Sequence, residues 1–394
     1  MILTSRRMLT DAGLVPGWVR VEGGTIAACG LGTPGVGSRE ATSGPTLDLG
    51  ERTLSAGLVD VHCHGGGGGS FTSGAVDEAR RAVRTHREAG TTSIMASLVT
   101  DAVPNLLEQV EGLAGLVAEG ELLGIHLEGP CLSALHRGAH EPSLLRAPAD
   151  VDVATLARAG GGAVAMMTLA TELPGGLDAV RTLREAGVVA ALGHTDATYE
   201  QAREALAAGV EVATHLCNAM RGLHHREPGP ILACLLHESA WLEVIADGVH
   251  SAWPVVAGLF AAAPDRVVLV TDAMSAAGMS DGTTWLGPLE VNVRDGVARL
   301  VSTGAIAGST LTLAEAVRRC VRDAGLDLAT VLPAATAHPA DLLGRTDIGR
   351  LVAGASADLV VLDGGASPGE DVQVTAVMRG GRWLRSPEGG SAPA

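Results

Sequence analysis

The middle of the chain repeats one unit, in which a helical stretch ends in a small residue and glycine and a short apolar run follows. Helix ends of this kind include Ala89-Gly90, Ala186-Gly187 and Ala208-Gly209, where glycine adopts a left-handed backbone without steric cost. Apolar runs without polar alternation are typical of parallel strands covered by helices. Eight such runs occur, at residues 58–61, 92–99, 122–127, 164–169, 188–192, 210–213, 242–245 and 267–270. Eight β-then-α units predict an α/β fold, the (β/α)8 or TIM barrel, whose sites lie at the carboxyl ends of the strands.

Both ends of the chain predict β-hairpins instead. Residues 18–30 are strand-like on either side of Gly23-Gly24, and residues 377–383 are strand-like around Gly380-Gly381. An apolar run at residues 357–363 adds a further strand. We therefore expect a small β-sandwich domain that is built from both termini.

The predicted domain boundaries follow from this change of pattern. We assign residues 1–55 and 351–394 to the small β domain and residues 56–350 to a catalytic barrel. Residues 285–301 interrupt the eighth barrel unit and predict an inserted β-hairpin with Asp295-Gly296 as its turn.

The composition excludes several classes of function. Lysine is absent, since all 28 positively charged residues are arginine, and this excludes a P-loop, a Schiff-base lysine and a metal site bridged by a carboxylated lysine. A net charge of −16 argues against a nucleic-acid binder. The six cysteines include no C-x-x-C pair, which is typical of reduced thiols in the cytoplasm. No apolar run is long enough for a membrane span, and we expect no signal peptide.

Polar residues close six of the predicted strands, where barrel side chains converge. These strand ends are Asp60-Val-His62-Cys-His64, His126-Leu-Glu128-Gly-Pro130, Gly193-His194-Thr-Asp196, Thr214-His215-Leu-Cys-Asn218, Asp247-Gly-Val-His250 and Thr271-Asp272. In a His-x-His pattern both imidazoles lie on one face of a strand, because side chains alternate with a period of two. Two histidines beside a glycine-rich turn are also ordinary loop residues, but the further His, Asp and Glu strand ends favour a divalent metal site.

The run Gly65–Gly69 resembles a phosphate-binding loop only superficially. It lacks the Gly-x-Gly-x-x-Gly context at the start of a Rossmann helix. Glycines at this point allow the backbone to lie close to the other groups of a crowded site, because glycine has no Cβ.

These strand ends, together with Arg226-Glu-Pro-Gly and Gly304-Ala-Ile-Ala-Gly-Ser309, resemble the N-acetylglucosamine-6-phosphate deacetylases of the amidohydrolase superfamily. The resemblance covers roughly residues 50–363, and its most specific pieces are Thr-His-Leu-x-Asn-Ala-Met and Arg-Glu-Pro-Gly. It implies metal-dependent hydrolysis of an amino-sugar phosphate to glucosamine-6-phosphate and acetate, in amino-sugar catabolism and cell-wall recycling. The alternatives are the N-acetylgalactosamine-6-phosphate epimer, another N-acyl substrate, a sugar-phosphate isomerase or a catalytically silent binding barrel.

The resemblance also implies the metal ligands and the catalytic groups. Glu128, His194 and His215 match the ligands of a principal metal, and His62 and His64 match a pair that holds a second. We expect one or two divalent ions per subunit, zinc first, with cobalt, manganese, iron and cadmium as alternatives.

Catalysis is expected to depend on two further residues. Asp272 matches the general acid and base, and His140 matches the group that polarises the acetyl carbonyl. A turn-capping Asp272 and a surface His140 are the alternative interpretations.

Four positions are expected to bind the substrate, namely Asn218, Ala219, Arg226 and His250. The fixed fork of donors in arginine suits a phosphate, and the resemblance implies that Arg226 serves the neighbouring subunit of a homodimer. Cys131 follows Glu128 closely, and we hypothesise that it lines the mouth of the site, with a buried structural thiol as the alternative.

Overall fold

The computed structural model describes residues 1–34 and 45–387. Contacts within the chain divide it into two units. The first comprises Met1–Val59, His86–Ser93 and Leu313–Ala394, and the second comprises Asp60–Thr85 and Ile94–Thr312. No helix among the described residues is long and apolar enough to cross a membrane.

The second unit is built on a parallel sheet of seven strands, which pair in chain order. These strands are β10 (Ala96–Val99), β11 (Ile125–Glu128), β12 (Val164–Leu169), β13 (Val189–Leu192), β14 (Val212–Ala213), β15 (Trp241–Ile245) and β16 (Val267–Val270). Most of their side chains are buried on both faces, as the unalternated apolar runs predict.

Residues 60–64 close this sheet into a barrel. The amide of Ser97 donates to the Cys63 carbonyl at 2.8 Å, and the amide of Asp272 donates to the His62 carbonyl at 2.8 Å. The segment therefore lies between the first and last strands of the sheet. This confirms the predicted (β/α)8 barrel.

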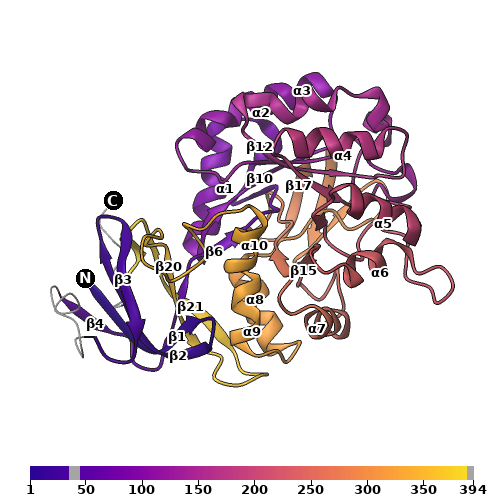
Figure 1. Ribbon diagram of the computed structural model, residues 1–394. Coiled ribbons are helices and arrows are strands. Elements are labelled where there is room, and N and C mark those ends of the chain that lie inside the picture. The colour runs from indigo at the N-terminus through magenta and orange to yellow at the C-terminus, as the bar shows by residue number, and fades with distance from the viewer. Residues whose placement is uncertain (35–44, 388–394) are drawn as a thin grey trace. The chain divides into compact units, whose positions relative to one another are not determined.

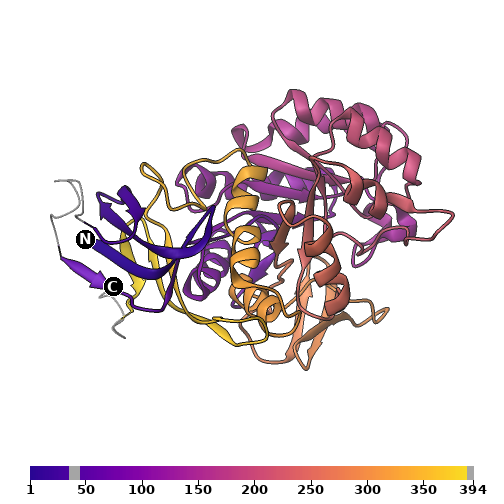
Figure 2. The same ribbon diagram turned by 60° about the horizontal axis from the view of Figure 1, so that its bottom comes forward.

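Helices connect the strands and cover their outer side (Figures 1 and 2). They are α2 (Val103–Ala118), α3 (Val153–Arg158), α4 (Gly176–Glu185), α5 (Tyr199–Ala208), α6 (Gly229–Leu236) and α7 (Trp253–Ala262). Helix α2 buries one stripe at a spacing of three to four residues, consisting of Leu106, Val110, Leu113 and Leu116. These helices hold the strand ends in place on which the site is built.

A β insertion follows β16 and differs in extent from the prediction. It has three antiparallel strands, β17 (Gly282–Leu286), β18 (Leu289–Arg294) and β19 (Val297–Leu300). The predicted turn is correct, since Asp295 and Gly296 have φ values of 53° and 72°. The predicted hairpin at 285–301 misses most of β17, because Gly282, Thr283 and Thr284 carry no apolar alternation.

The first unit contains one continuous mixed sheet with the order β22-β21-β20-β5-β1-β2-β3, and β4 lies beside β1. The strands are β1 (Ile2–Thr10), β2 (Gly13–Glu22), β3 (Thr25–Leu31), β4 (Thr46–Asp48), β5 (Thr53–Ala56), β20 (Leu359–Gly364), β21 (Val372–Arg379) and β22 (Arg382–Arg385). Both termini contribute strands, and the expected hairpins turn at Gly23-Gly24 and Gly380-Gly381.

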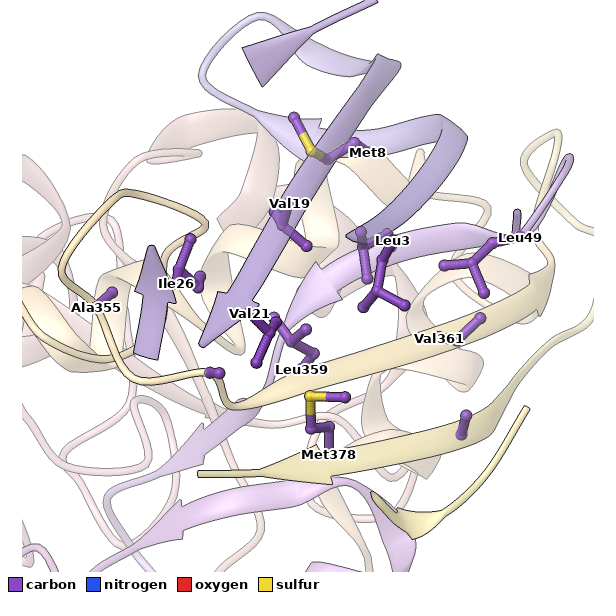
Figure 3. Packing of buried hydrophobic residues seen from close by; sticks show 13 residues of the cluster. Leu3, Met8, Val19, Val21, Ile26, Leu49, Ala355, Leu359, Val361 and Met378 are labelled. Atoms are coloured by element: carbon purple, nitrogen blue, oxygen red, sulfur yellow. The ribbon is translucent and has the colours of Figure 1, made fainter. Parts of the chain in front are cut away.

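The core of this sheet lies between its N-terminal and C-terminal strands. Leu3, Val19 and Val21 from the first strands meet Leu359 and Met378 from the last (Figure 3). Each of these side chains is almost completely removed from water. Burial of aliphatic groups from both chain ends explains why the two termini form one domain.

The division by contacts differs from the predicted domain boundaries at residues 56–59 and 86–93 and over the longer stretch 313–350. This stretch carries helices α8 (Leu313–Arg322), α9 (Leu328–Ala334) and α10 (Ala337–Leu342), and it belongs to the first unit. The remaining elements are β6 (Leu58–Asp60), β7 (Gly65–Gly66), β8 (Gly69–Ser70), α1 (Val76–Ala89) and β9 (Thr91–Ile94). The predicted strand at 92–99 is thus divided, at Met95, between β9 and β10.

Candidate active site

A pocket of about 360 Å³ opens at the carboxyl ends of the barrel strands. Glu128 is the last residue of β11, and His194, His215 and Asp272 each lie two residues beyond β13, β14 and β16. Side chains at these positions point toward the barrel mouth, as barrel geometry requires. The titratable residues that line the pocket are His64, Glu128, His136, His140, His194, His215, His250 and Asp272.

One group of candidate metal ligands centres on Glu128. Its Oε1 lies 3.1 Å from His194 Nε2 and 2.9 Å from His215 Nε2, and the two Nε2 atoms are 3.1 Å apart. The other ring nitrogen of His194, Nδ1, donates to the His136 carbonyl at 2.8 Å. The Nε2 lone pair of His194 is therefore free to face Glu128.

A second group shares the same carboxylate. His64 Nε2 lies 3.2 Å from Glu128 Oε2 and 3.1 Å from Asp272 Oδ1, while His62 Nε2 lies 3.2 Å from His64 Nε2. His64 Nδ1 donates to the carbonyl of Ser97 at 3.1 Å. Glu128 can thus bridge two groups of ligands, which are His62, His64, Glu128 and Asp272, and Glu128, His194 and His215.

The donor chemistry of both groups fits a divalent cation. Imidazole nitrogens and carboxylates are the usual ligands of Zn²⁺ and related ions, and outer partners of metal-binding histidines are usually carbonyls or carboxylates. In this site, two of the outer partners are the carbonyls that accept from His64 and His194. Lone pairs that face each other at about 3 Å repel unless a cation or a proton lies among them.

The charges in the pocket keep the carboxylates ionised. Burial alone raises the pKa of the Glu128 carboxyl, but the surrounding imidazoles, His62 first, outweigh it and hold this pKa well below its ordinary value. For Asp272 burial also acts to raise the pKa, and His62 and His64 outweigh it in the same way. Both groups are therefore available as ligands or proton acceptors at neutral pH.

His140 is held as a neutral donor. Burial lowers its pKa to about 4, so its imidazole carries no charge at neutral pH. The backbone amide of Thr100 donates to His140 Nδ1 at 3.4 Å, and the Thr100 hydroxyl lies 2.8 Å from the same atom. Since Nδ1 accepts, Nε2 carries the proton, and it lies 3.5 Å from Glu128 Oε2.

Three of these residues adopt a strained backbone. His194, His215 and Asp272 have φ values of 48°, 30° and 47°, in the left-handed region that non-glycine residues rarely enter. Each such conformation costs about 1–3 kcal/mol and persists where the surrounding fold imposes it. The left-handed backbone turns each side chain into the site just after its strand ends, so that His194 and His215 face Glu128 and Asp272 faces His64.

Most of the residues singled out in the sequence meet at the pocket. Those that line it are His64, Glu128, His140, His194, His215, Asn218, Ala219, His250 and Asp272. His62 is fully buried and lies against His64 and Glu128. Arg226 is exposed on the loop between β14 and α6, where its guanidinium lies 2.7 Å from His225 Nε2, and it does not line the pocket of its own chain.

Cys131 requires a correction. Its side chain is fully buried and is not among the residues that line the pocket. Burial raises the pKa of its thiol to about 12, so it is not a reactive thiolate at neutral pH. The hypothesis of a thiol at the mouth of the site is therefore wrong, and the alternative of a structural thiol fits the observed position.

Sequence reasoning missed several supporting residues. Glu243 is fully buried in β15 and lies 3.0 Å from His62 Nδ1. Its signal was an isolated acid within the apolar run 242–245. His136 and Thr100, which contact His194 and His140, carry no signal, because loop packing alone brings them to the site. Leu286 of the insertion, with Ala305 and Ile306 from the segment that follows it, adds apolar side chains to the pocket lining.

The fold and the donor set are those of a barrel that can hold a divalent metal at the carboxyl ends of its strands. The family model of the amidohydrolase family matches residues 53–384, and the chain belongs to this family. A structure of the N-acetyl-D-glucosamine-6-phosphate deacetylase from Mycobacterium smegmatis in complex with N-acetyl-D-glucosamine-6-phosphate is similar over 98% of this chain and 99% of that chain, with 44% identity and a TM-score of 0.90.

Two curated relatives carry related names. The N-acetylgalactosamine-6-phosphate deacetylase of Escherichia coli O157:H7 is 35% identical over 370 residues, which cover 92% of this chain and 95% of the relative. The N-acetylglucosamine-6-phosphate deacetylase of Vibrio furnissii is 35% identical over 346 residues, which cover 86% and 85%. Both relatives are deacetylases of an N-acetylated hexosamine phosphate, and they differ in the epimer that they are named for.

Proposed function

We propose that this protein is an N-acetylglucosamine-6-phosphate deacetylase, which hydrolyses the N-acetyl group to glucosamine-6-phosphate and acetate. The observation that carries the proposal is the convergence of Glu128, His194, His215 and Asp272 on one pocket. It gains support from the 44% identity to the substrate-bound Mycobacterium smegmatis enzyme. The chain would then act in amino-sugar catabolism, in the cytoplasm.

The metal would be held by residues that already face one another. Glu128, His194 and His215 would hold the principal ion, and His62 and His64, with Glu128 as a bridge, would hold a second. A bound divalent ion supplies Lewis-acid polarisation and lowers the pKa of a water from 15.7 towards about 7. We propose zinc, with cobalt, manganese, iron and cadmium as ions that the same donors accept.

Proton transfer is the role of Asp272. Its carboxylate is ionised and buried against His64, so it can accept a proton from the attacking water. The same carboxyl then delivers this proton to the departing amine, which is a poor leaving group unless it is protonated. His140 Nε2–H can donate to the acetyl oxygen as negative charge develops there.

The phosphate requires donors beyond the pocket of one chain. Among the residues that the structure describes, none of those lining this pocket is an arginine. His250 holds its Nδ1 2.7 Å from Asp247, and this carboxylate outweighs burial and raises the pKa of the imidazole, so His250 can donate to a phosphate oxygen. Amides near Asn218 and Ala219 add donors. We propose that Arg226 completes the phosphate site of the neighbouring subunit in a homodimer.

The direct test is acetate release from N-acetylglucosamine-6-phosphate. The reaction is run with Zn²⁺, Co²⁺ or Mn²⁺, after chelation, and with unphosphorylated N-acetylglucosamine beside it. Chelator-sensitive release from the phosphate alone supports the reaction, the metal and the phosphate site. No release with any of these metals would overturn the proposed substrate.

The galacto epimer is the second candidate. The relative from Escherichia coli O157:H7, which is named for that epimer, matches over 95% of its length. The same assay with N-acetylgalactosamine-6-phosphate separates the two, since the higher kcat/KM identifies the preferred epimer.

A further inference from the structure

A buried carboxylate that no catalytic step uses lies beneath the candidate metal ligands. Glu243 is the central residue of β15, and its side chain is completely buried. It is flanked in the sequence of this strand by the buried apolar residues Leu242 and Val244. An ionisable group is costly in such a place unless it makes specific interactions.

Glu243 contacts both groups of candidate ligands through one oxygen. Its Oε2 lies 3.0 Å from His62 Nδ1 and accepts the backbone amide of His215 at 3.2 Å. His62 belongs to the second group of ligands and His215 to the first. One carboxylate oxygen therefore links a ring in one group to the backbone of the other.

The contact with His62 determines which nitrogen of that ring faces the site. Glu243 Oε2 accepts the His215 amide and is an acceptor at this contact as well, so the Nδ1 of His62 donates to it. Nε2 is then the ring nitrogen that faces His64 and Glu128, at 3.2 Å and 3.6 Å. The ring of His126 packs edge-on against His62, with centroids 4.6 Å apart, and restricts its rotation further.

The other candidate ligands are oriented differently. His64 and His194 donate from Nδ1 to the carbonyls of Ser97 and His136, which no side-chain substitution removes. Among the described residues, the acceptor for Nδ1 of His62 is a side chain, that of Glu243. Removal of the Glu243 carboxylate is therefore expected to lower the metal affinity of the two groups of ligands unequally.

We infer that Glu243 is a positioning residue, which orients His62 and couples it to His215, and on which binding of an ion by His62 and His64 depends. The inference rests on the proposed metal dependence. Outer partners of metal-binding histidines typically contribute roughly ten- to a hundredfold to affinity. The ion held by Glu128, His194 and His215 is expected to change less, because Glu243 contacts that group only through a backbone amide.

The test uses Zn²⁺ as the probe and compares Glu243→Gln with the wild type. The number of ions per subunit and the chelator concentration that removes each ion are measured by metal analysis. We expect the more weakly held ion of Glu243→Gln to leave at a roughly ten- to a hundredfold lower chelator concentration, while the other stays near its wild-type value. Glu211→Gln, the same substitution at an exposed position, is the matched control.

Three results would overturn the inference: two ions held as tightly by Glu243→Gln as by the wild type, equal weakening of both, or a single ion in the wild type. None of these results concerns acetate release, so the deacetylase proposal is tested separately. Circular dichroism of the metal-free variants, together with Glu243→Asp, which keeps the charge, distinguishes loss of positioning from failure to fold. We expect Glu243→Asp to hold the second ion more tightly than Glu243→Gln does, because aspartate retains a carboxylate acceptor.

Discussion

At the scale of single residues, the site depends on which nitrogen each imidazole offers. His64 and His194 direct their Nδ1 protons to backbone carbonyls, and His62 directs its own to Glu243. Every one of these rings therefore turns Nε2 toward Glu128. His140 has the opposite arrangement, since Thr100 donates to its Nδ1 and leaves a proton on Nε2. One residue type thus serves as a ligand or as a donor, according to its outer partner.

The role of Asp272 predicts a large catalytic defect. Asp272→Asn is expected to lower kcat by about a hundred- to ten-thousandfold, because the amide cannot accept the proton from water. Binding of an ion by Glu128, His194 and His215 is expected to persist. Turnover and metal content are measured on the same sample, with the exposed Asp265→Asn as control. Near-normal turnover with the metal in place would contradict this mechanism.

The buried position of Cys131 predicts resistance to thiol reagents. With its side chain inaccessible and its thiol pKa raised to about 12, Cys131 is expected to react with a maleimide much more slowly than the partly exposed Cys29 and Cys217. Peptide mapping by mass spectrometry after timed labelling measures these rates. Labelling of Cys131 as fast as that of Cys29 in the folded protein would show that the loop opens.

At the scale of elements, strand ends and helix starts carry the site. Helix α5 follows His194 closely and begins with a capping box, in which the Thr198 hydroxyl accepts the Gln201 amide at 3.2 Å and the Gln201 side chain accepts the Thr198 amide at 2.9 Å. It ends at Gly209, where φ is 117°. These local signals are legible in the sequence. The left-handed backbone of His194 is not, because nothing in its local sequence favours such a conformation.

The capping box predicts a moderate loss of stability without loss of chemistry. Thr198→Ala is expected to lower the free energy of unfolding by about 1 kcal/mol, because the amide of Gln201 loses its acceptor. Urea unfolding followed by circular dichroism measures the change, with the exposed Thr283→Ala as control. An unfolding free energy equal to that of the wild type would mean that water replaces the cap without cost.

At the scale of the whole molecule, the candidate metal site lies in a pocket that, among the described residues, no arginine lines. The net charge is −16, and the guanidinium expected to bind phosphate, that of Arg226, is exposed on a loop. An anionic substrate on such an acidic protein requires a local concentration of donors. In the proposed homodimer Arg226 would supply one to the neighbouring subunit, because a two-fold axis would exchange the same loop in both directions.

Subunit mixing tests this exchange. Arg226→Ala is expected to raise KM for the phosphorylated substrate, because one charge-assisted contact is lost, and Asp272→Asn to abolish turnover. When the two variants are mixed and allowed to exchange subunits, the site with an intact Asp272 receives Arg226 from its neighbour. We expect about a quarter of the sites to regain a wild-type KM, as random pairing into dimers predicts. No regain after exchange would place Arg226 outside the neighbouring site.

Much of the fold and of the candidate site could be predicted from the sequence alone. The barrel could be predicted because unalternated apolar runs and glycine helix ends are local signals; eight runs occur, and five of them follow such a glycine. The grouping of His62, His64, Glu128, His194 and His215 could be predicted because all follow strands that must end at one side of the barrel. A correct prediction of the fold class therefore also predicted that these five residues meet at one site.

Tertiary structure decided the rest, for a physical reason. The left-handed φ of Asp272, the buried place of Cys131 and the contact between Glu243 and His62 each arise from packing between segments far apart in the chain. A local pattern shows which residues can fold together, whereas burial and hydrogen-bond partners depend on what packs around each residue. The sequence thus determined which groups meet at the barrel mouth, and the tertiary structure decided their orientation, their protonation and their access to water.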